Sequence, residues 1–263
     1  MGTEGQPAPE KSPDQYFRYL ASLGMTKHIG AMQATSELIE RCHIGPDSYV
    51  LDVGCGVGIT PCYLAKTYNC RVMGIDILEE MIAQSRRRAK RMGVEDRVEF
   101  QVADARDLPF DDGTFDVVLG ESINTFFADK VKAIRGYVRV LKPGGYVGLT
   151  EMTWLQPPTP ERAAYYKRVV YADSLEKDGW RQLLEEAGLQ DVVANAYHID
   201  VSQEAKGRLQ RYGCSGMIGV LFRTVASIIR NPSSREFLKD VTSSVPQDMM
   251  ADMGYGVFVG KKP

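Results

Sequence analysis

The chain has 263 residues, 44% of them hydrophobic, so it is long for one domain and can bury a full core. Its 32 lysines and arginines nearly balance 34 aspartates and glutamates, and a net charge of −2 provides no basic field for unspecific nucleic-acid binding. No apolar run reaches the roughly 18 residues of a membrane span, and the first residues lack the apolar core of a secretion signal. We therefore expect one elaborated, soluble cytoplasmic domain without a nucleic-acid partner or stable membrane insertion.

The cysteines give no sign of a disulfide framework or a metal site. They are odd in number, and no two form a C-x-x-C pair. We expect reduced thiols, most of them packed in the core, and no bound metal. A metalloid site is likewise disfavoured, because the cysteines show no evident clustering: Cys42, Cys55, Cys62, Cys70 and Cys214.

The amino-terminal region divides into a tail and two helical pieces. Residues 1–12 are rich in proline, glycine and charge, which is typical of a disordered tail. Residues 13–44 show helical patterns at 14–23 and at 30–42, with a break between them near a glycine. We expect these helices to precede the main domain.

Between residues 45 and 151, strand-like and helix-like segments alternate. This alternation predicts βαβ units and a parallel sheet covered by helices on both faces. In such sheets, ligands bind beyond the carboxyl ends of the strands. The strand-like runs are Tyr49–Val53, Arg71–Ile75, Val98–Val102, Phe115–Leu119 and Gly145–Leu149.

The first strand-like run leads directly into a glycine-rich turn, in the sequence VLDVGCGVGIT. Gly54, Gly56 and Gly58 lack Cβ atoms, so a ligand could contact the main chain there. A helix over residues 60–66 would direct its amides and its positive dipole end at that ligand. A dinucleotide fingerprint would require a glycine at Ile59, and a nucleoside-triphosphate loop is also absent from the sequence.

Several motifs follow this turn in a fixed order. Asp52 stands two residues before the first glycine, Asp76 lies in VMGIDILEEM, and Asp104 lies in FQVADARDLPF. The sequences FDVVLGES and RVLKPGGYVGLTE come next. Over residues 45–151 this series resembles the class I S-adenosylmethionine-dependent methyltransferases. The resemblance implies a Rossmann-like, doubly wound α/β fold with a seven-stranded, mostly parallel sheet, an antiparallel last strand and a helical cap.

The resemblance also implies how S-adenosylmethionine is bound. The glycine turn and Asp52 would hold its methionine part, Asp76 would accept hydrogen bonds from the ribose hydroxyls, and Asp104 would accept one from the adenine amine. Each residue also has a plain alternative: glycines mark turns, Asp76 can cap a helix, and Asp104 can belong to a polar loop. The predicted cofactor-binding residues are Asp52, Gly54, Cys55, Gly56, Gly58, Asp76, Ile77, Asp104, Ala105, Arg106 and Glu121.

Methyl transfer from a sulfonium requires few catalytic side chains, because it depends chiefly on holding the nucleophile in line and excluding water. A general base is needed only if the accepting atom must lose a proton early. The candidates are Glu121, Glu151 and His28. Alternatively, the two glutamates bind loop amides or the amino group of the cofactor. The resemblance also implies that the helices of residues 13–44 close over the cofactor. His28 lies in a part of this region that is similar to the closing segment of related enzymes, or it is a surface histidine.

Two insertions surround this common core, at residues 152–175 and 201–252 within a domain that extends to residue 263. Between them we expect a helix over 175–187 and a strand over 191–199, and the terminal MGYGVFVGKK has the alternation of a last strand. The second insertion reads as helical with a break at Asn231-Pro232 and would cap an acceptor pocket. Its sequence GMIGVLFRTVASII is apolar on nearly every helical face, which indicates a buried cap helix or contact with an apolar acceptor or bilayer surface.

The sequence therefore predicts a methyltransferase that acts on a small organic acceptor by in-line displacement. The alternatives are a lipid or quinone acceptor at a membrane surface, with peripheral membrane contact, and a non-catalytic or regulatory cofactor-binding protein. A different use of the same cofactor, such as cyclisation, is not separated from methyl transfer by the sequence. The acceptor atom and the oligomeric state are likewise left open.

Overall fold

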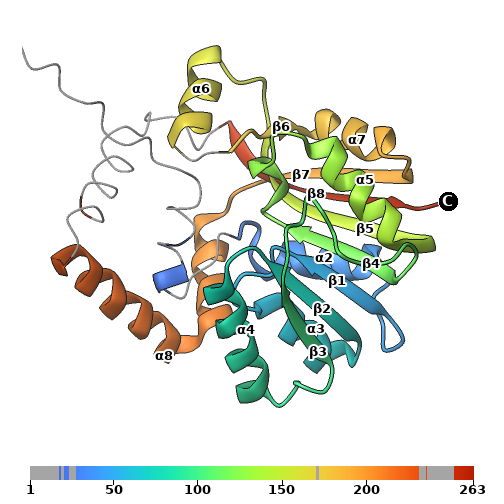
Figure 1. The fold of residues 1–263 in the computed structure, drawn as a ribbon. Coiled ribbons are helices and arrows are strands. Elements are labelled where there is room, and N and C mark those ends of the chain that lie inside the picture. The colour runs from blue at the N-terminus through green and yellow to red at the C-terminus, as the bar shows by residue number, and fades with distance from the viewer. Residues whose placement is uncertain (1–17, 19–20, 24–27, 170–171, 231–234, 236–251) are drawn as a thin grey trace, which may run out of the picture.

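A computed structural model gives the fold of the chain (Figure 1). The structure describes residues 18, 21–23, 28–169, 172–230, 235 and 252–263. The predicted tail at residues 1–12 and the predicted break at Asn231-Pro232 lie outside these residues.

One mixed sheet forms the centre of the domain. Its strands are β1 (Tyr49–Val53), β2 (Arg71–Asp76), β3 (Val98–Val102), β4 (Phe115–Glu121), β5 (Leu141–Trp154), β6 (Leu175–Glu176), β7 (Gln190–His198) and β8 (Met253–Lys261). They are ordered β3-β2-β1-β4-β5-β8-β7, and β6 pairs with β5 off this path. The seven expected strands are confirmed, and β6 is an additional two-residue strand within a segment predicted to be helical.

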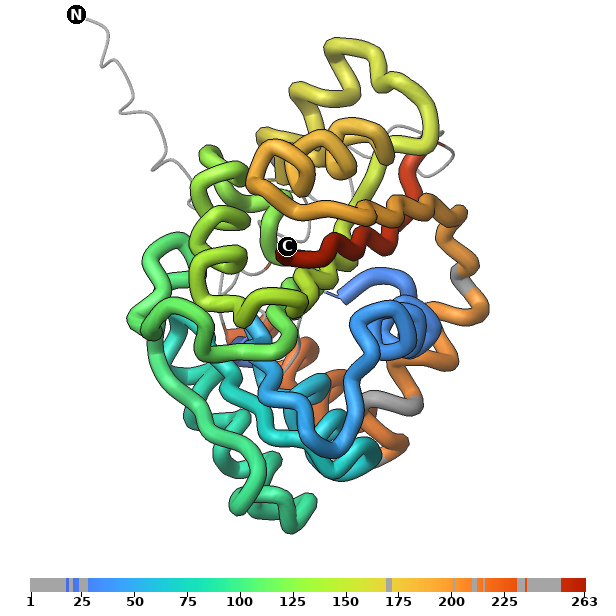
Figure 2. Tube along the Cα trace, turned by 90° about the vertical axis from the view of Figure 1, so that its right-hand side faces the viewer, coloured from blue at the N-terminus to red at the C-terminus, as the bar shows by residue number. Residues whose placement is uncertain are grey.

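The strand directions match the prediction. β1 pairs in parallel with β2 and β4, and β4 pairs in parallel with β5. The last strand, β8, runs antiparallel between β5 and β7 (Figure 2). The winding of the sheet changes direction between β1 and β4. From β1, the chain first adds β2 and β3 on one side and then β4 and β5 on the other. The carboxyl ends of β1, β2 and β4 therefore meet where such sheets bind ligands.

Helices cover both faces of the sheet. They are α2 (Ala31–Arg41), α3 (Ile59–Tyr68), α4 (Glu79–Met92), α5 (Lys130–Val140) and α7 (Lys177–Glu186), with a short 3-10 helix, η1 (Asn124–Phe126). Successive strand residues point to opposite faces, so Val117 packs with the cluster under α2, α3 and α4, whereas Val118 packs with the cluster under α5 and α7. Both faces of the central strands β1 and β4 are thus largely apolar and buried, as their apolar runs predict.

The two predicted insertions carry the remaining helices. α6 (Pro160–Val169) follows β5, and α8 (Val201–Arg230) follows β7. α8 is kinked at Gly213, whose φ of 66° and ψ of 169° are not helical. Its first half packs against the start of α2, because a Cβ added to Gly207 would lie 2.6 Å from the Cβ of Ala31. α8 is therefore anchored to the domain at its amino-terminal half.

Candidate functional site

The glycine turn connects β1 to α3 at the carboxyl edge of the sheet. All three glycines have left-handed backbone, with φ of 69°, 55° and 73° at Gly54, Gly56 and Gly58. A Cβ at Gly54 would lie 2.2 Å from the side chain of Ile123, and one at Gly58 would lie 2.8 Å from that of Ser85. Two of the glycines are thus required by the protein's own packing as well as by backbone conformation. Gly58 is also the N-cap of α3, and no side chain of the described residues caps the helix by a hydrogen bond there.

Asp76 ends β2 beside this turn, and its carboxylate is fixed by main-chain amides. One oxygen accepts a hydrogen bond from the Gly56 amide at 2.9 Å and the other accepts one from the Leu78 amide at 3.0 Å. Burial raises the pKa of Asp76, while these amides oppose the rise. Each oxygen keeps lone-pair capacity for a further donor. Next to it, the apolar side chain of Ile77 is 55% exposed, and Val102 at the end of β3 is 42% exposed.

Asp52 is buried on β1 within a group of acids. Burial raises its pKa well above the ordinary value, and the charges of Glu121 and Asp76 raise it further. These three carboxylates come from the adjacent strands β1, β2 and β4. They therefore form a site of negative potential at the carboxyl edge, which a cationic group would stabilise.

Asp104 follows β3 and is engaged by a nearby arginine. The Arg106 guanidinium donates to both carboxylate oxygens at 2.6 to 3.1 Å, and the Arg106 amide also donates to Asp104 at 2.9 Å. The hydrogen bond from Arg106 is the main reason that the pKa of Asp104 lies below its usual value. Ala105 between them is buried. Asp104 follows β3 and Glu121 ends β4, so the two carboxylates lie on opposite sides of β1 and β2 in the strand order.

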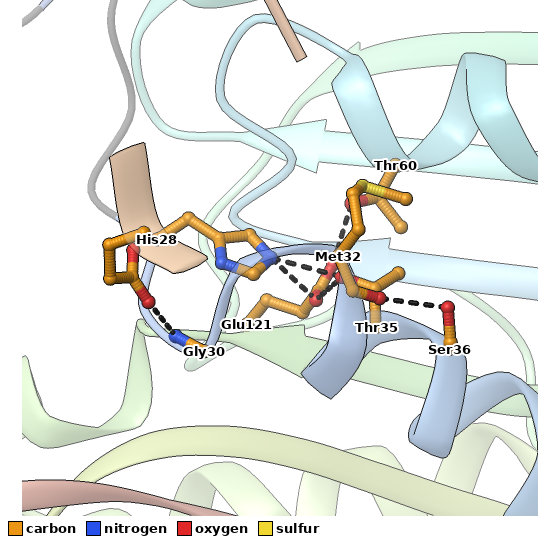
Figure 3. Close-up of polar contacts among 8 residues, drawn as sticks. His28, Gly30, Met32, Thr35, Ser36, Thr60 and Glu121 are labelled. Atoms are coloured by element: carbon orange, nitrogen blue, oxygen red, sulfur yellow. Dashed lines mark hydrogen bonds and ion pairs between the residues drawn. The ribbon is translucent and has the colours of Figure 1, made fainter. Parts of the chain in front are cut away.

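Glu121, the last residue of β4, binds three side chains from other elements (Figure 3). Thr60 at the start of α3 donates to one carboxylate oxygen at 2.6 Å. Thr35 of α2 donates to the other oxygen at 2.7 Å, and His28 Nε2 lies 2.8 Å from that same oxygen. The His28 side chain is 10% exposed, so it is not a surface histidine. Two of the residues predicted from the sequence are therefore in direct contact.

This environment keeps Glu121 ionised. Burial opposes ionisation, but His28 and the hydrogen bonds from Thr60 and Thr35 outweigh it and lower the pKa of Glu121 to about 2. A carboxylate with so low a pKa is a weak proton acceptor near neutral pH. The arrangement suits an anchor for the segment that carries His28 better than a general base.

The same segment is held from its other side by the cap helix. The Gly30 amide donates to a carboxylate oxygen of Glu204 in α8 at 2.7 Å. Gly30 has a φ of 84°, and a Cβ there would lie 2.5 Å from that of Ala34. Residues 28–30 are thus fixed between Glu121 at the sheet edge and Glu204 on the cap.

Glu151 lies on β5 and is fully buried. One of its oxygens accepts hydrogen bonds from the amides of Ile123 and Asn124 at 3.1 and 2.7 Å and from the Asn124 side chain at 2.9 Å. Burial raises the pKa of Glu151 to about 7, against the lowering effect of these bonds. The pKa suits a general base, but the carboxylate serves the amides of the loop after β4, which was the alternative raised from the sequence.

Several residues of this site were not identified from the sequence. Thr35 and Thr60 complete the group around Glu121, and a threonine seven residues after His28 gave no distinctive signal. Ser122 has a left-handed backbone with a φ of 59°, and its buried hydroxyl has no hydrogen-bond partner among the residues that the structure describes. A strained, buried polar residue at a strand end is typical of functional sites.

The arrangement fits S-adenosylmethionine on several independent grounds. Asp76 is fixed with free lone pairs beside the exposed apolar side chain of Ile77, which suits a ribose hydroxyl pair next to an adenine ring. The acidic group at Asp52 and Glu121 suits the positive charge of the cofactor's amino group. The turn after β1 presents left-handed glycine backbone beside these acids.

The cysteines play no part in this geometry except for Cys55 in the turn. Cys42, Cys55, Cys62 and Cys70 are buried free thiols, and Cys214 is an exposed one. Burial raises the pKa of Cys42 and Cys62. Such thiols behave as small apolar residues.

Comparison with known proteins identifies the family. Residues 51–149 match the methyltransferase domain model. The chain is 31% identical to an uncharacterized protein of Haemophilus influenzae, over 83% of this chain and 89% of that protein. It is 34% identical to phosphoethanolamine N-methyltransferase 1 of Arabidopsis thaliana, over 69% of this chain and 37% of that protein. Phosphoethanolamine N-methyltransferase of Triticum aestivum is 30% identical, over 89% of this chain and 45% of that protein. The chain thus spans less than half of the length of these two plant enzymes.

Solved structures share the fold. The crystal structure of the cyclase SpnF matches with a TM-score of 0.73 at 22% sequence identity. The match covers 98% of this chain and 97% of the SpnF chain. Phosphoethanolamine N-methyltransferase 2 of Haemonchus contortus, in complex with S-adenosylhomocysteine, has a TM-score of 0.71 at 18% identity, over 97% of this chain and 59% of that one. Together with the ordered acids at the carboxyl edge of a sheet of this topology, these similarities place the chain in the class I methyltransferase family, whose cofactor is S-adenosylmethionine.

Proposed function

We propose that this protein transfers a methyl group from S-adenosylmethionine to a small organic acceptor by in-line displacement. The observation that carries the proposal is the group of Asp52, Asp76 and Glu121 at one sheet edge, where burial and mutual repulsion raise the pKa of Asp52. Buried like charges are costly unless a ligand or partner compensates them. A cofactor with a positive amino group and ribose hydroxyls would supply that compensation.

When bound, S-adenosylmethionine supplies an electrophilic methyl group on a positively charged sulfur. The chain's own contribution would be to orient the two reactants and exclude water. Asp76 would hold the ribose hydroxyls, while Glu121, through His28, would fix the amino-terminal segment over the cofactor. We assign His28 and Glu121 to positioning because a carboxylate with a pKa of about 2 is a poor base at neutral pH.

Amines are the first acceptor class to test. A neutral amine attacks through its lone pair and needs no early deprotonation, so it matches a site in which Glu121 and Glu151 are both engaged by other groups of the chain. Relatives also support this choice, since those from Arabidopsis thaliana and Triticum aestivum are phosphoethanolamine N-methyltransferases and one from Rauvolfia serpentina is a norajmaline N-methyltransferase. The norajmaline enzyme is 43% identical over 36% of this chain.

Radiolabelled S-adenosylmethionine tests the proposal. Purified protein would be incubated with an amine panel that includes phosphoethanolamine, and with metabolite extract, and the label would be followed into water-soluble and solvent-extracted products. We expect a labelled water-soluble product. A product found only in the solvent extract would support a lipid or quinone acceptor instead. No product, despite calorimetric binding of S-adenosylhomocysteine, would support a non-catalytic cofactor-binding protein.

The cofactor site has its own test. Asp76→Ala should lose most of the affinity for S-adenosylhomocysteine in calorimetry, because the ribose hydroxyls would lose their acceptor. Asp112→Ala is the matched control, since this acid pairs with Arg139 at 2.7 Å just before β4, at the opposite edge of the sheet. Unchanged affinity in Asp76→Ala, or equal losses in both variants, would refute the assignment.

A further inference from the structure

The second half of α8 has an exposed apolar face among the residues that the structure describes. Its exposed large side chains are spaced by four, three and four residues along the helix, at Ile218, Phe222, Val225 and Ile229, and Leu221 flanks them. This spacing places them on one side of a helix. Phe222 is 71% exposed and Ile229 is 70% exposed. The expectation of a buried cap helix is therefore wrong for this half of α8.

The opposite side of the same helix faces the domain. Val220 is buried there, and the Arg223 guanidinium donates to the Leu23 carbonyl at 2.8 Å. Residues Tyr212–Arg230 are long and apolar enough to cross a bilayer by length and composition. Only 6% of this stretch is buried, and Val220 and Arg223 hold it to the described residues of the domain. A helix held in this way can lie on a membrane surface.

The charges of α8 favour an anionic partner. The helix carries five basic residues and one acid, Glu204, which already accepts the Gly30 amide. Lys206 and Arg208 are exposed before the kink at Gly213, and Arg230 is exposed at the end of the second half. Helix α4, which lies beside the first half of α8 in Figure 1, also has exposed basic residues in its last two turns, at Arg87, Lys90 and Arg91.

We propose that the exposed face of α8 docks on an anionic lipid bilayer, with Phe222 and its apolar neighbours inserted among the acyl chains and the basic residues at the headgroups. Helices with an apolar face and a cationic border bind such interfaces. A second copy of this chain fits less well, because two basic helices would repel each other. The proposal does not depend on the acceptor of the methyl group.

Vesicle co-sedimentation of the full chain tests this docking. We expect binding to vesicles of phosphatidylcholine mixed with phosphatidylglycerol, weaker binding to phosphatidylcholine alone, and a decrease with added salt. The double variant Phe222→Ser/Ile229→Ser should lose about tenfold or more in partitioning, because two large apolar side chains no longer insert. Its thermal unfolding should match that of the wild type, since both side chains are mostly exposed in the folded protein.

Leu209→Ser is the matched control. Like Phe222 and Ile229, Leu209 is an exposed large apolar residue of α8, but it lies before the kink at Gly213. Equal losses in this control and in the double variant would refute the assignment to the second half of the helix. Absence of wild-type binding, or equal binding to neutral and anionic vesicles, would overturn the proposal. The proposal would also be overturned if the wild type formed a dimer that bound no vesicles and the double variant were a monomer.

Discussion

Glu121 offers the sharpest test of how the amino-terminal segment is held. Replacing it with glutamine removes the charge and preserves the shape of the side chain. The amide oxygen can still accept from Thr35 and His28, and the Thr60 hydroxyl can turn to accept from the amide nitrogen. The variant thus isolates the electrostatic contribution of the buried carboxylate.

The shifted pKa gives the magnitude. Lowering the pKa of Glu121 from 4.5 to about 2 corresponds to about 3 kcal/mol of stability when the group is ionised. Because the pKa is lower in the folded protein, this contribution is complete above pH 4.5 and is lost as the pH falls to about 2. Glu121→Gln should therefore lower the free energy of unfolding by about 3 kcal/mol at every pH between 4.5 and 7.

Glu151→Gln is a control of the same chemistry with the opposite sign. Burial raises the pKa of Glu151 from 4.5 to about 7. Between these values the unfolded chain loses the proton of Glu151 more readily than the folded protein does, so the free energy of unfolding falls as the pH rises. Relative to the wild type, Glu151→Gln should become more stable by about 3 kcal/mol between pH 4.5 and 7. Its amide oxygen can retain the three bonds to the loop after β4.

Urea denaturation followed by circular dichroism across this pH range measures both differences. Amide hydrogen exchange gives a local readout, because Glu121→Gln should speed exchange at the start of α2, next to Thr35, whereas Glu151→Gln should not. If both variants lost the same free energy at every pH, or if Glu121→Gln cost nothing at neutral pH, the assigned electrostatics would be incorrect.

Three further predictions concern the cofactor turn and the cap. Asp52→Asn should raise the stability of the free protein at neutral pH, because it removes a carboxyl group whose ionisation is disfavoured by burial and by Glu121. It should also weaken S-adenosylmethionine binding. Thermal unfolding with and without cofactor measures both effects, and a loss of free-protein stability would contradict the cause given for the raised pKa. Gly58→Ala should lower the free energy of unfolding by about 1–3 kcal/mol, because alanine is strained at a φ of 73° and its Cβ would crowd Ser85. Urea denaturation measures this loss, and an unchanged midpoint would be inconsistent with the packing. Removing residues 202–250 should abolish turnover in the radiolabel assay while leaving some cofactor affinity, and a fully active truncation would show that this insertion is not an acceptor lid.

Much of the fold followed from the sequence because local signals and the global architecture agree. The apolar runs from Tyr49 to Leu149 alternate with helical patterns, and such alternation has few solutions other than a parallel sheet. The glycines after β1 and the acids after successive strands fall at one edge because parallel strands share a direction. The extended β5 was less predictable, since Lys142-Pro143-Gly144-Gly145 reads as a turn but lies within the range of that strand.

The sequence by itself determined which residues lie at the carboxyl ends of the strands, because strand period and turn chemistry are local properties. It could not decide what each acid does there. Glu121 and Glu151 are both glutamates that end or follow an apolar run, yet one has a pKa of about 2 and the other of about 7. That difference arises from His28, Thr35 and Thr60 on one side and from loop amides on the other. Partners separated by tens of residues are brought together only by tertiary structure, which alone sets the charge of a buried group.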